Sequence, residues 1–151
     1  MRAVIQRVKS ASVEVDGEIV SRIGPGLCVF VGLKDGDSGP DVEFIGRKIL
    51  NMRLFENADT GKAWDRSVMD MGLEVLLVSQ FTLYGILKGN KPDFHHAMPP
   101  SQAREAYENF VEHIRKSYSP NMIKDGVFGA KMDVAIVNDG PVTYQLDSKA
   151  K

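Results

Sequence analysis

The segment Ser79-Gln80-Phe81-Thr82 places side chains that could act in hydrolysis at the end of an apolar run, "LEVLLV". Polar groups at the end of such a strand need hydrogen-bond partners, either in the fold or in a ligand. A hydroxyl becomes a nucleophile only with a base within reach, and the following loop offers His95 or His96 for that role. Taken alone, the residues favour local roles, with Ser79 closing a turn and Thr82 acting as a β-branched strand residue.

The second candidate is Gly140-Pro141, which lies between strand patterns at 134–137 and 142–146. Proline has no amide hydrogen to donate to a ladder, so it interrupts strand pairing. If the bond is cis, the backbone reverses sharply and two carbonyls project outward, and a glycine leaves them open to close approach. An ordinary trans turn is the alternative, because X-Pro bonds are cis in only about 5–6% of cases. The local sequence leaves both open.

Other kinds of site find little support in the sequence. His95-His96 is the only histidine pair, and neighbouring side chains on an extended chain point to opposite sides. A zinc site needs three or four convergent ligands, so we predict no metal. No phosphate-binding glycine loop follows a strand, so we also predict no nucleotide cofactor.

The composition favours a single domain in the cytoplasm. The net charge of −1 over 151 residues argues against a broad basic face for nucleic acid, although it permits binding of one RNA end. A lone cysteine, Cys28, cannot form an internal disulfide, lies in an apolar run and is expected to be buried. No run approaches the roughly 18 apolar residues of a membrane span, and the N-terminal pattern is unlike that of a signal peptide. We therefore expect a soluble protein without a membrane partner.

The hydrophobic periodicity predicts a mixed α/β fold. We expect one domain over residues 1–147 with a short tail at 148–151, seven or eight strands and two long helices. Two helices cannot cover both faces of so much sheet, which favours helix, sheet and sheet layers. The expected helices begin near Asp41 and at Ser101, and residues 85–100 form a polar loop. The expected strands lie at 3–8, 12–15, 18–23, 27–33, 73–84, before 138 and at 142–146.

Two short stretches together resemble the signature motifs of the D-aminoacyl-tRNA deacylases. They are "SQFTL" at 79–83 and "NDGPVT" at 138–143. The similarity extends along the chain, through "AVIQRV", "RKILNMRLFE", "KGNKPDF" and "FGAKM". The resemblance implies a homodimeric editing enzyme without a cofactor. Such an enzyme hydrolyses the ester that joins a D-amino acid to the terminal adenosine of tRNA.

The resemblance also implies roles for individual residues. Gly140 and Pro141, joined in cis, would reach into the partner's site and occupy the space that an L side chain needs, while Arg7 holds this turn by hydrogen bonds. Achiral glycine would still enter. The terminal adenine would bind along Phe128, Gly129, Ala130 and Met132, whose alternative role is ordinary core. Ser79 would contact the substrate, and Lys88 and Lys91 could touch phosphates.

Two mechanisms are open for the hydrolysis. Thr82 could attack the ester, which requires a base. Alternatively, water attacks with help from the ribose hydroxyl, while Gln80 and the amides of Phe81 and Thr82 hold the oxyanion. We favour the second mechanism. Two rival functions remain: a serine or threonine esterase, and a non-enzymatic dimeric module that binds nucleic acid or another ligand.

Overall fold

The computed structural model describes residues 1–150 and contains eight strands and two long helices, as the sequence predicted. The helices are α1 (Gly39–Asn51), the short α2 (Val68–Met71) and α3 (Pro100–Ser117), and a 3-10 turn covers Phe81–Tyr84. The strands are β1 (Arg2–Val15), β2 (Glu18–Ile23), β3 (Gly26–Gly32), β4 (Glu74–Ser79), β5 (Ile86–Lys88), β6 (Lys91–Asp93), β7 (Ile123–Asp125) and β8 (Asp133–Asp147).

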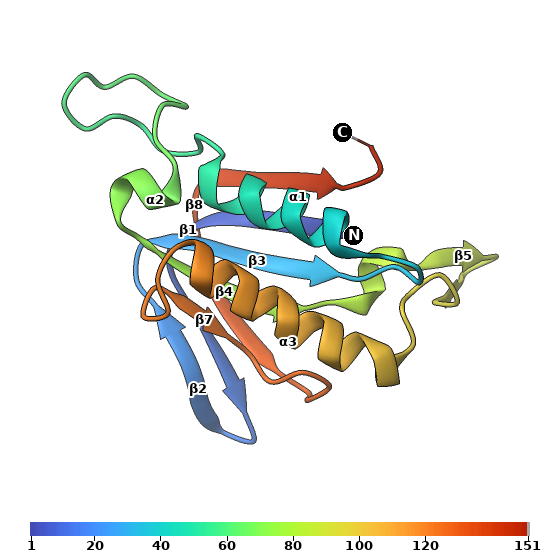
Figure 1. Cartoon of the computed structure of the whole chain (residues 1–151). Coiled ribbons are helices and arrows are strands. Elements are labelled where there is room, and N and C mark those ends of the chain that lie inside the picture. Colours follow the sequence, from blue (N-terminus) through green and yellow to red (C-terminus); the bar gives the residue numbers. More distant parts are fainter. Residues whose placement is uncertain (151) are drawn as a thin grey trace.

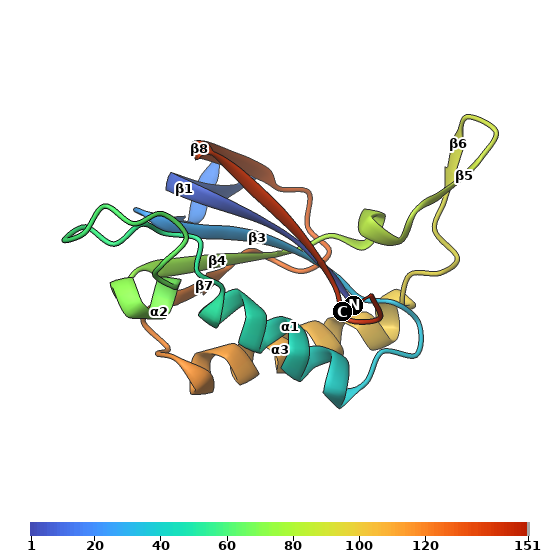
Figure 2. The ribbon, with the colours of Figure 1, turned by 90° about the horizontal axis from the view of Figure 1, so that it is seen from above.

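The strands β3 and β4 lie in the middle of the main sheet and are buried on both faces. The sheet order is β2-β1-β3-β4-β7, and β8 pairs with β1. Alternate side chains of a strand point to opposite faces, so each of these strands serves two cores. Leu27 and Val29 pack with α1 and α3, whereas Cys28 packs in the second cluster on the other face. Both long helices therefore cover one face of the sheet (Figures 1 and 2).

The second core is closed by the far halves of the two longest strands. Residues 2–8 of β1 pair with β3, while residues 11–15 pair with β2, and β8 follows β1 along both halves. The far halves contribute apolar residues that pack against Cys28, Leu76 and Val78. The predicted order of helix, sheet and further sheet is thus confirmed.

The predicted strand over 73–84 is wrong in its last part. The strand β4 ends at Ser79, and the amide of Gln80 donates to the carbonyl of Val31 at 2.7 Å. Its neighbour β3 ends at Gly32, where an added Cβ would lie 2.9 Å from the Leu83 Cβ and 3.0 Å from the Gln80 carbonyl oxygen. A glycine in β3 therefore lets the chain fold back into the 3-10 turn.

Three further expectations need correction. The segments 3–8 and 12–15 form one strand, because β8 pairs with β1 over both of them. The second helix begins at Pro100 rather than after a Ser101 cap, since proline suits a first turn whose amides lack partners. The expected loop over 85–100 contains the β5–β6 hairpin, with Gly89 at a φ of +64° in its turn.

The first residues of the predicted tail are held in the fold, while residue 151 lies outside the described residues. Ser148 is buried, and its hydroxyl donates to Asp41 Oδ1 at 2.7 Å and accepts from the Met1 amine at 2.9 Å. Lys149 Nζ lies 3.0 Å from the same Asp41 oxygen. These contacts join the end of β8 to the first turn of α1.

Candidate functional site

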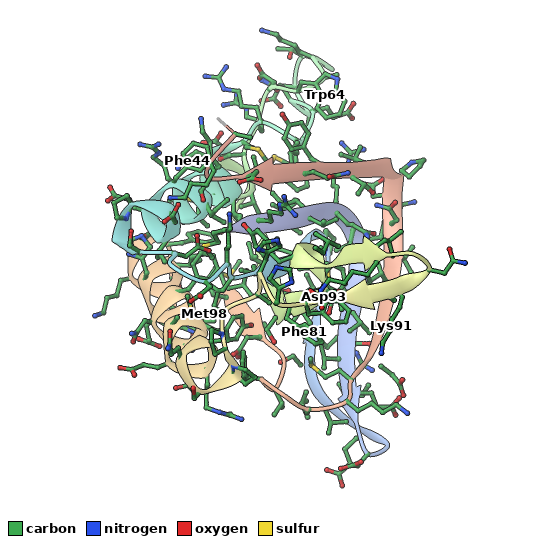
Figure 3. The ribbon with its side chains drawn as sticks, turned by 90° about the vertical axis from the view of Figure 1, so that its right-hand side faces the viewer. Phe44, Trp64, Phe81, Lys91, Asp93 and Met98 are labelled. Atoms are coloured by element: carbon green, nitrogen blue, oxygen red, sulfur yellow. The ribbon has the colours of Figure 1, made fainter. Side chains whose placement is uncertain are left out.

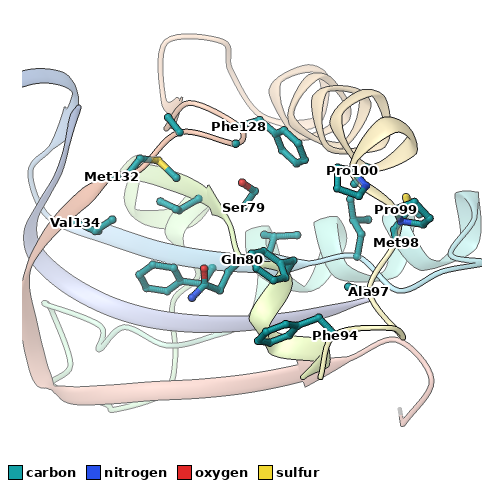
Figure 4. A pocket seen from close by; sticks show the side chains of 18 of the residues that line it. Ser79, Gln80, Phe94, Ala97, Met98, Pro99, Pro100, Phe128, Met132 and Val134 are labelled. Atoms are coloured by element: carbon teal, nitrogen blue, oxygen red, sulfur yellow. The ribbon is translucent and has the colours of Figure 1, made fainter. Parts of the chain in front are cut away.

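A cleft of about 910 Å³ opens at the carboxyl ends of the parallel strands β3 and β4. Open α/β sheets commonly bind ligands at this edge. The start of α3 contributes Pro100 and Ala103 to the lining. The segment after β7 contributes Phe128, which lies beside α3, and Met132, which lies farther from that helix (Figure 4). The lining is mostly apolar, and its few polar side chains are Ser79 and Gln80 at the end of β4 and His95 from the loop before α3.

The polar segment that follows β4 lies at the floor of this cleft. Ser79, Gln80 and Phe81 line it, and Figure 4 shows the Ser79 hydroxyl facing the same space as the Phe128 ring. Thr82 is exposed and does not line the cleft. The amides of Phe81 and Thr82 belong to the first turn of the 3-10 helix, where amides lack acceptors inside the helix.

The four predicted adenine-binding residues come together on one wall. Phe128, Gly129, Ala130 and Met132 all line the cleft. The Phe128 ring lies 5.8 Å from the Tyr107 ring, and the Arg104 guanidinium covers it at 5.0 Å. These contacts hold a flat aromatic face beside the cavity.

The loop between β6 and α3 contributes residues that the sequence motifs did not identify as site residues. Phe94 and His95 line the cleft, and the Phe94 ring meets Phe81 edge to face at 5.0 Å. Asp93 pairs with the Nδ1 of His95, and this hydrogen bond lowers the pKa of the Asp93 carboxyl to about 2. The available signals were "KGNKPDF", a stretch of the family resemblance that ends at Phe94, and the candidate base His95, but the hairpin itself was not predicted.

Gly140 and Pro141 lie outside the cleft of their own chain. Their peptide bond is cis, and both residues are exposed. The flanking rungs of the β1–β8 ladder are Gln6↔Thr143 and Val8↔Asn138, so residues 139–142 bulge out opposite Arg7 alone. The turn therefore projects from the sheet edge.

The Arg7 side chain makes an ion pair with this turn in place of the hydrogen bonds that the resemblance implied, and Asn138 supplies hydrogen bonds. Arg7 Nε lies 3.3 Å from Asp139 Oδ2, an ion pair without hydrogen-bond geometry, and Nη1 donates to the Leu54 carbonyl at 2.7 Å. The Asn138 side chain donates to the carbonyls of Arg7 and Val142, at 2.9 and 3.2 Å. Asn138 thus holds the turn by hydrogen bonds. It is the first residue of the motif "NDGPVT", but the sequence alone did not predict this role.

Cys28 is buried as predicted, and burial raises the pKa of its thiol to about 12. It packs in a cluster that shares Val78 and Met132 with the cleft lining, but Cys28 itself does not line the cleft. Residues 1–150 hold no group of three or more His, Cys, Asp or Glu side chains arranged for a metal ion. No helix in this range has both the length and the apolar character that crossing a bilayer requires.

Comparison with known proteins places these features in one family. A model of the D-Tyr-tRNA(Tyr) deacylase family matches residues 4–147. A D-aminoacyl-tRNA deacylase of Dictyostelium discoideum is 56% identical over 100% of both chains, and one of Drosophila melanogaster is 59% identical over 98% of this chain and 92% of that protein. The solved structure of a c-Myc DNA Unwinding Element Binding Protein matches with a TM-score of 0.94 and 56% identity, over 97% of this chain and 98% of that one. The chain therefore belongs to the D-Tyr-tRNA(Tyr) deacylase family, whose members are hydrolases that act on aminoacyl-tRNA.

Proposed function

We propose that this protein hydrolyses the ester between a D-amino acid and the 3′-terminal adenosine of tRNA in the cytoplasm. The observation that carries the proposal is the cleft, which is large enough for an aminoacyl-adenosine. Residues of the segment "SQFTL" and a set of apolar side chains line it together. Within it, the adenine lies along Phe128 to Met132, and the ester lies over Ser79 and Gln80. The lone buried thiol agrees with a reducing compartment.

The reaction that we propose uses water rather than a protein nucleophile. A water oxygen bonds to the ester carbonyl carbon, the bond to the ribose oxygen breaks, and that oxygen leaves with a proton. The neighbouring ribose hydroxyl assists the proton transfer. The Gln80 side chain and the amides of Phe81 and Thr82 stabilise the negative oxygen, because such donors act most strongly where charge develops. The exposure of Thr82 supports this mechanism over attack by its hydroxyl.

Selection against L-amino acids requires a second copy of the chain in this proposal. Gly140 and Pro141 project away from their own cleft, so the partner's turn enters it and fills the space of an L side chain. The strand β8 pairs only with β1 among residues 1–150 and exposes 52% of Val137 and 50% of Tyr144. A long exposed edge strand with apolar side chains is normally covered in solution. A homodimer would cover it.

The decisive experiment compares charged tRNAs as substrates. The protein is incubated with D-tyrosyl-tRNA, L-tyrosyl-tRNA and glycyl-tRNA, and the release of amino acid is measured beside a protein-free control. We expect release from the D-tyrosyl and glycyl substrates and none above the control from the L-tyrosyl substrate. Release from neither tyrosyl substrate would contradict the proposed activity. Equal release from both would contradict the proposed exclusion of L-amino acids by the Gly140–Pro141 turn.

Binding of DNA is a second candidate function, because a protein of 56% identity is known as a DNA unwinding element binding protein. The net charge of −1 weighs against extended contact with duplex phosphates. Titration of labelled duplex and of tRNA at two salt concentrations separates the two candidates. Salt-sensitive duplex binding as tight as tRNA binding would favour the DNA function.

A further inference from the structure

The β5–β6 hairpin is a projecting arm that begins at the rim of the cleft. Its strands Ile86–Lys88 and Lys91–Asp93 form a separate two-stranded sheet outside the main sheet. Figures 2 and 3 show it extending away from the body, with Phe81 and Asp93 toward its base and Lys91 farther along. The chain that leaves β6 runs directly into Phe94 and His95, which line the cleft.

The base of this arm carries exposed aromatic rings. Phe81 is 58% exposed and Phe94 is 37% exposed, although the two rings contact each other. Phe94 also packs against Gly85, where an added Cβ would lie 2.9 Å from the ring, so the ring is fixed at the start of the arm. Exposed aromatic faces beside a nucleotide cleft can stack unpaired bases.

The outer part of the arm carries a positive charge that is not neutralised by a neighbour. Lys88 Nζ lies 3.4 Å from Asp93 Oδ1, and the other oxygen of Asp93 pairs with His95. Lys91 is exposed, and no carboxylate of residues 1–150 lies within ion-pair distance of its ammonium. Lys91 and Phe94 are three residue steps apart along an extended chain, which corresponds to about 10 Å.

We propose that this arm binds the unpaired nucleotides that immediately precede the terminal adenosine of the tRNA. The base next to the adenosine stacks on the Phe81 and Phe94 rim, and Lys91, assisted by Lys88, contacts the phosphates beyond it. This inference rests on the proposed function and extends the cleft into a path for a single RNA strand. A near-neutral protein thereby concentrates its RNA contacts on one short element.

Three D-tyrosyl substrates test the proposal: aminoacyl-adenosine, an aminoacylated trinucleotide with the tRNA 3′ sequence, and full-length tRNA. We expect Lys91→Ala to lower kcat/KM roughly three- to tenfold for the trinucleotide and the tRNA. The salt dependence of log kcat/KM should become shallower by about 0.7 for each of them. Aminoacyl-adenosine has no phosphate, so its hydrolysis should match that of the wild type.

Matched variants separate a charge effect from a structural effect. Lys91→Arg should stay close to the wild type, and Lys91→Glu should lose more activity than Lys91→Ala. Lys116→Ala, which removes an exposed lysine in the last turn of α3, should leave all three substrates unaffected.

Three results would overturn the inference. Equal losses of kcat/KM for Lys91→Ala on all three substrates would show that Lys91 has a structural role. An unchanged kcat/KM on every substrate would show that Lys91 does not contact the RNA. A loss confined to full-length tRNA would place Lys91 on the paired stem instead. If the wild type cleaves none of the substrates, the proposed function itself fails, so the two failures are distinguishable.

Discussion

At the scale of residues, the polar groups of the site differ most in their exposure to the cleft. Ser79 and Gln80 line it, whereas Thr82 faces solvent beside it. A side chain that only flanks the cleft is poorly placed for attack, but its backbone amide can still point inward. The exposure of the Thr82 side chain therefore favours attack by water over attack by the Thr82 hydroxyl.

We expect Thr82→Ala to keep kcat/KM on D-tyrosyl-tRNA within about threefold of the wild type. Removing a true nucleophile lowers kcat by roughly a thousandfold or more in well-studied hydrolases. Single-turnover hydrolysis with the folded variant is the measurement. A folded Thr82→Ala protein that binds substrate normally but does not hydrolyse it would establish attack by the Thr82 hydroxyl.

Gly140→Ala should impair D-amino acid hydrolysis or discrimination by about tenfold or more. Gly140 has a φ of +119°, and an added Cβ would lie 2.9 Å from Val142 Cγ2 and 3.1 Å from Arg7 Nη2. The turn must therefore shift. The ratio of D- to L-tyrosyl-tRNA hydrolysis is the readout. Gly17→Ala is the control, because its φ of +81° adds similar backbone strain with no atom within 4 Å; equal behaviour of both variants would exclude a special role for the turn.

At the scale of elements, the longer strands were predictable, whereas the short strands β5, β6 and β7 and the ends of the strands were not. Alternating or continuous apolar residues located β3 and β4, because both strands are buried on two faces. The end of β4 depends on Gly32, which is 47 residues earlier in the chain and next to it only in the fold. For the same reason the motifs identified Ser79, Gln80 and Phe128, whereas Phe94 joins the cleft through a hairpin with no strong pattern.

Gly32→Ala should displace the 3-10 turn and lower both activity and stability. The added methyl group would crowd Leu83 and the Gln80 carbonyl, and overpacking of this kind costs about 1–3 kcal/mol of unfolding free energy. Activity should fall further than this stability loss explains, since Gln80 and Phe81 move. Urea unfolding and kcat/KM measure the two effects. Gly39→Ala, in open space at the start of α1, should change neither.

The hydrogen bond from Ser148, after the end of β8, to Asp41 in α1 should make the unfolding free energy depend on pH. Burial alone would raise the pKa of Asp41, but hydrogen bonds from Ser148 and the Ser38 backbone, together with Lys149, hold it well below its usual range. The stabilisation is therefore complete above the unfolded pKa of about 3.9 and is lost as pH falls below it. Ser148→Ala should destabilise the protein by about 2 kcal/mol at pH 7. Asp41→Asn should cost less unfolding free energy at pH 3 than at pH 7, because the unfolded wild-type chain protonates Asp41 before the folded protein does.

Urea unfolding at the two pH values checks this difference. Ser117→Ala is the matched control, because its exposed hydroxyl donates to the neutral His113 carbonyl and its effect should not depend on pH. An Asp41→Asn effect of the same size at both pH values would show that folding does not lower the pKa of the Asp41 carboxyl.

At the scale of the whole molecule, the fold places the two parts of the proposed site, the cleft and the Gly140–Pro141 turn, apart from each other within one chain. The cleft opens at the ends of β3 and β4, while the Gly140–Pro141 turn leaves the sheet at the bulge opposite Arg7. In the homodimer that we propose, each complete site combines the cleft of one copy with the turn of the other. Dimerisation would thus be a condition for discrimination between the two enantiomers as well as for covering β8.

The outward placement of this turn means that two inactive chains should rescue each other. Gln80→Ala alters the cleft of its chain, and Gly140→Ala alters the turn of its chain. One of the two sites in a mixed dimer therefore combines the unaltered cleft of the Gly140→Ala chain with the unaltered turn of the Gln80→Ala chain. Random exchange of equal amounts should restore about a quarter of the wild-type D-specific activity. Co-refolding the two variants and assaying the mixture tests it, and a mixture no more active than its separate components would mean that each chain edits alone.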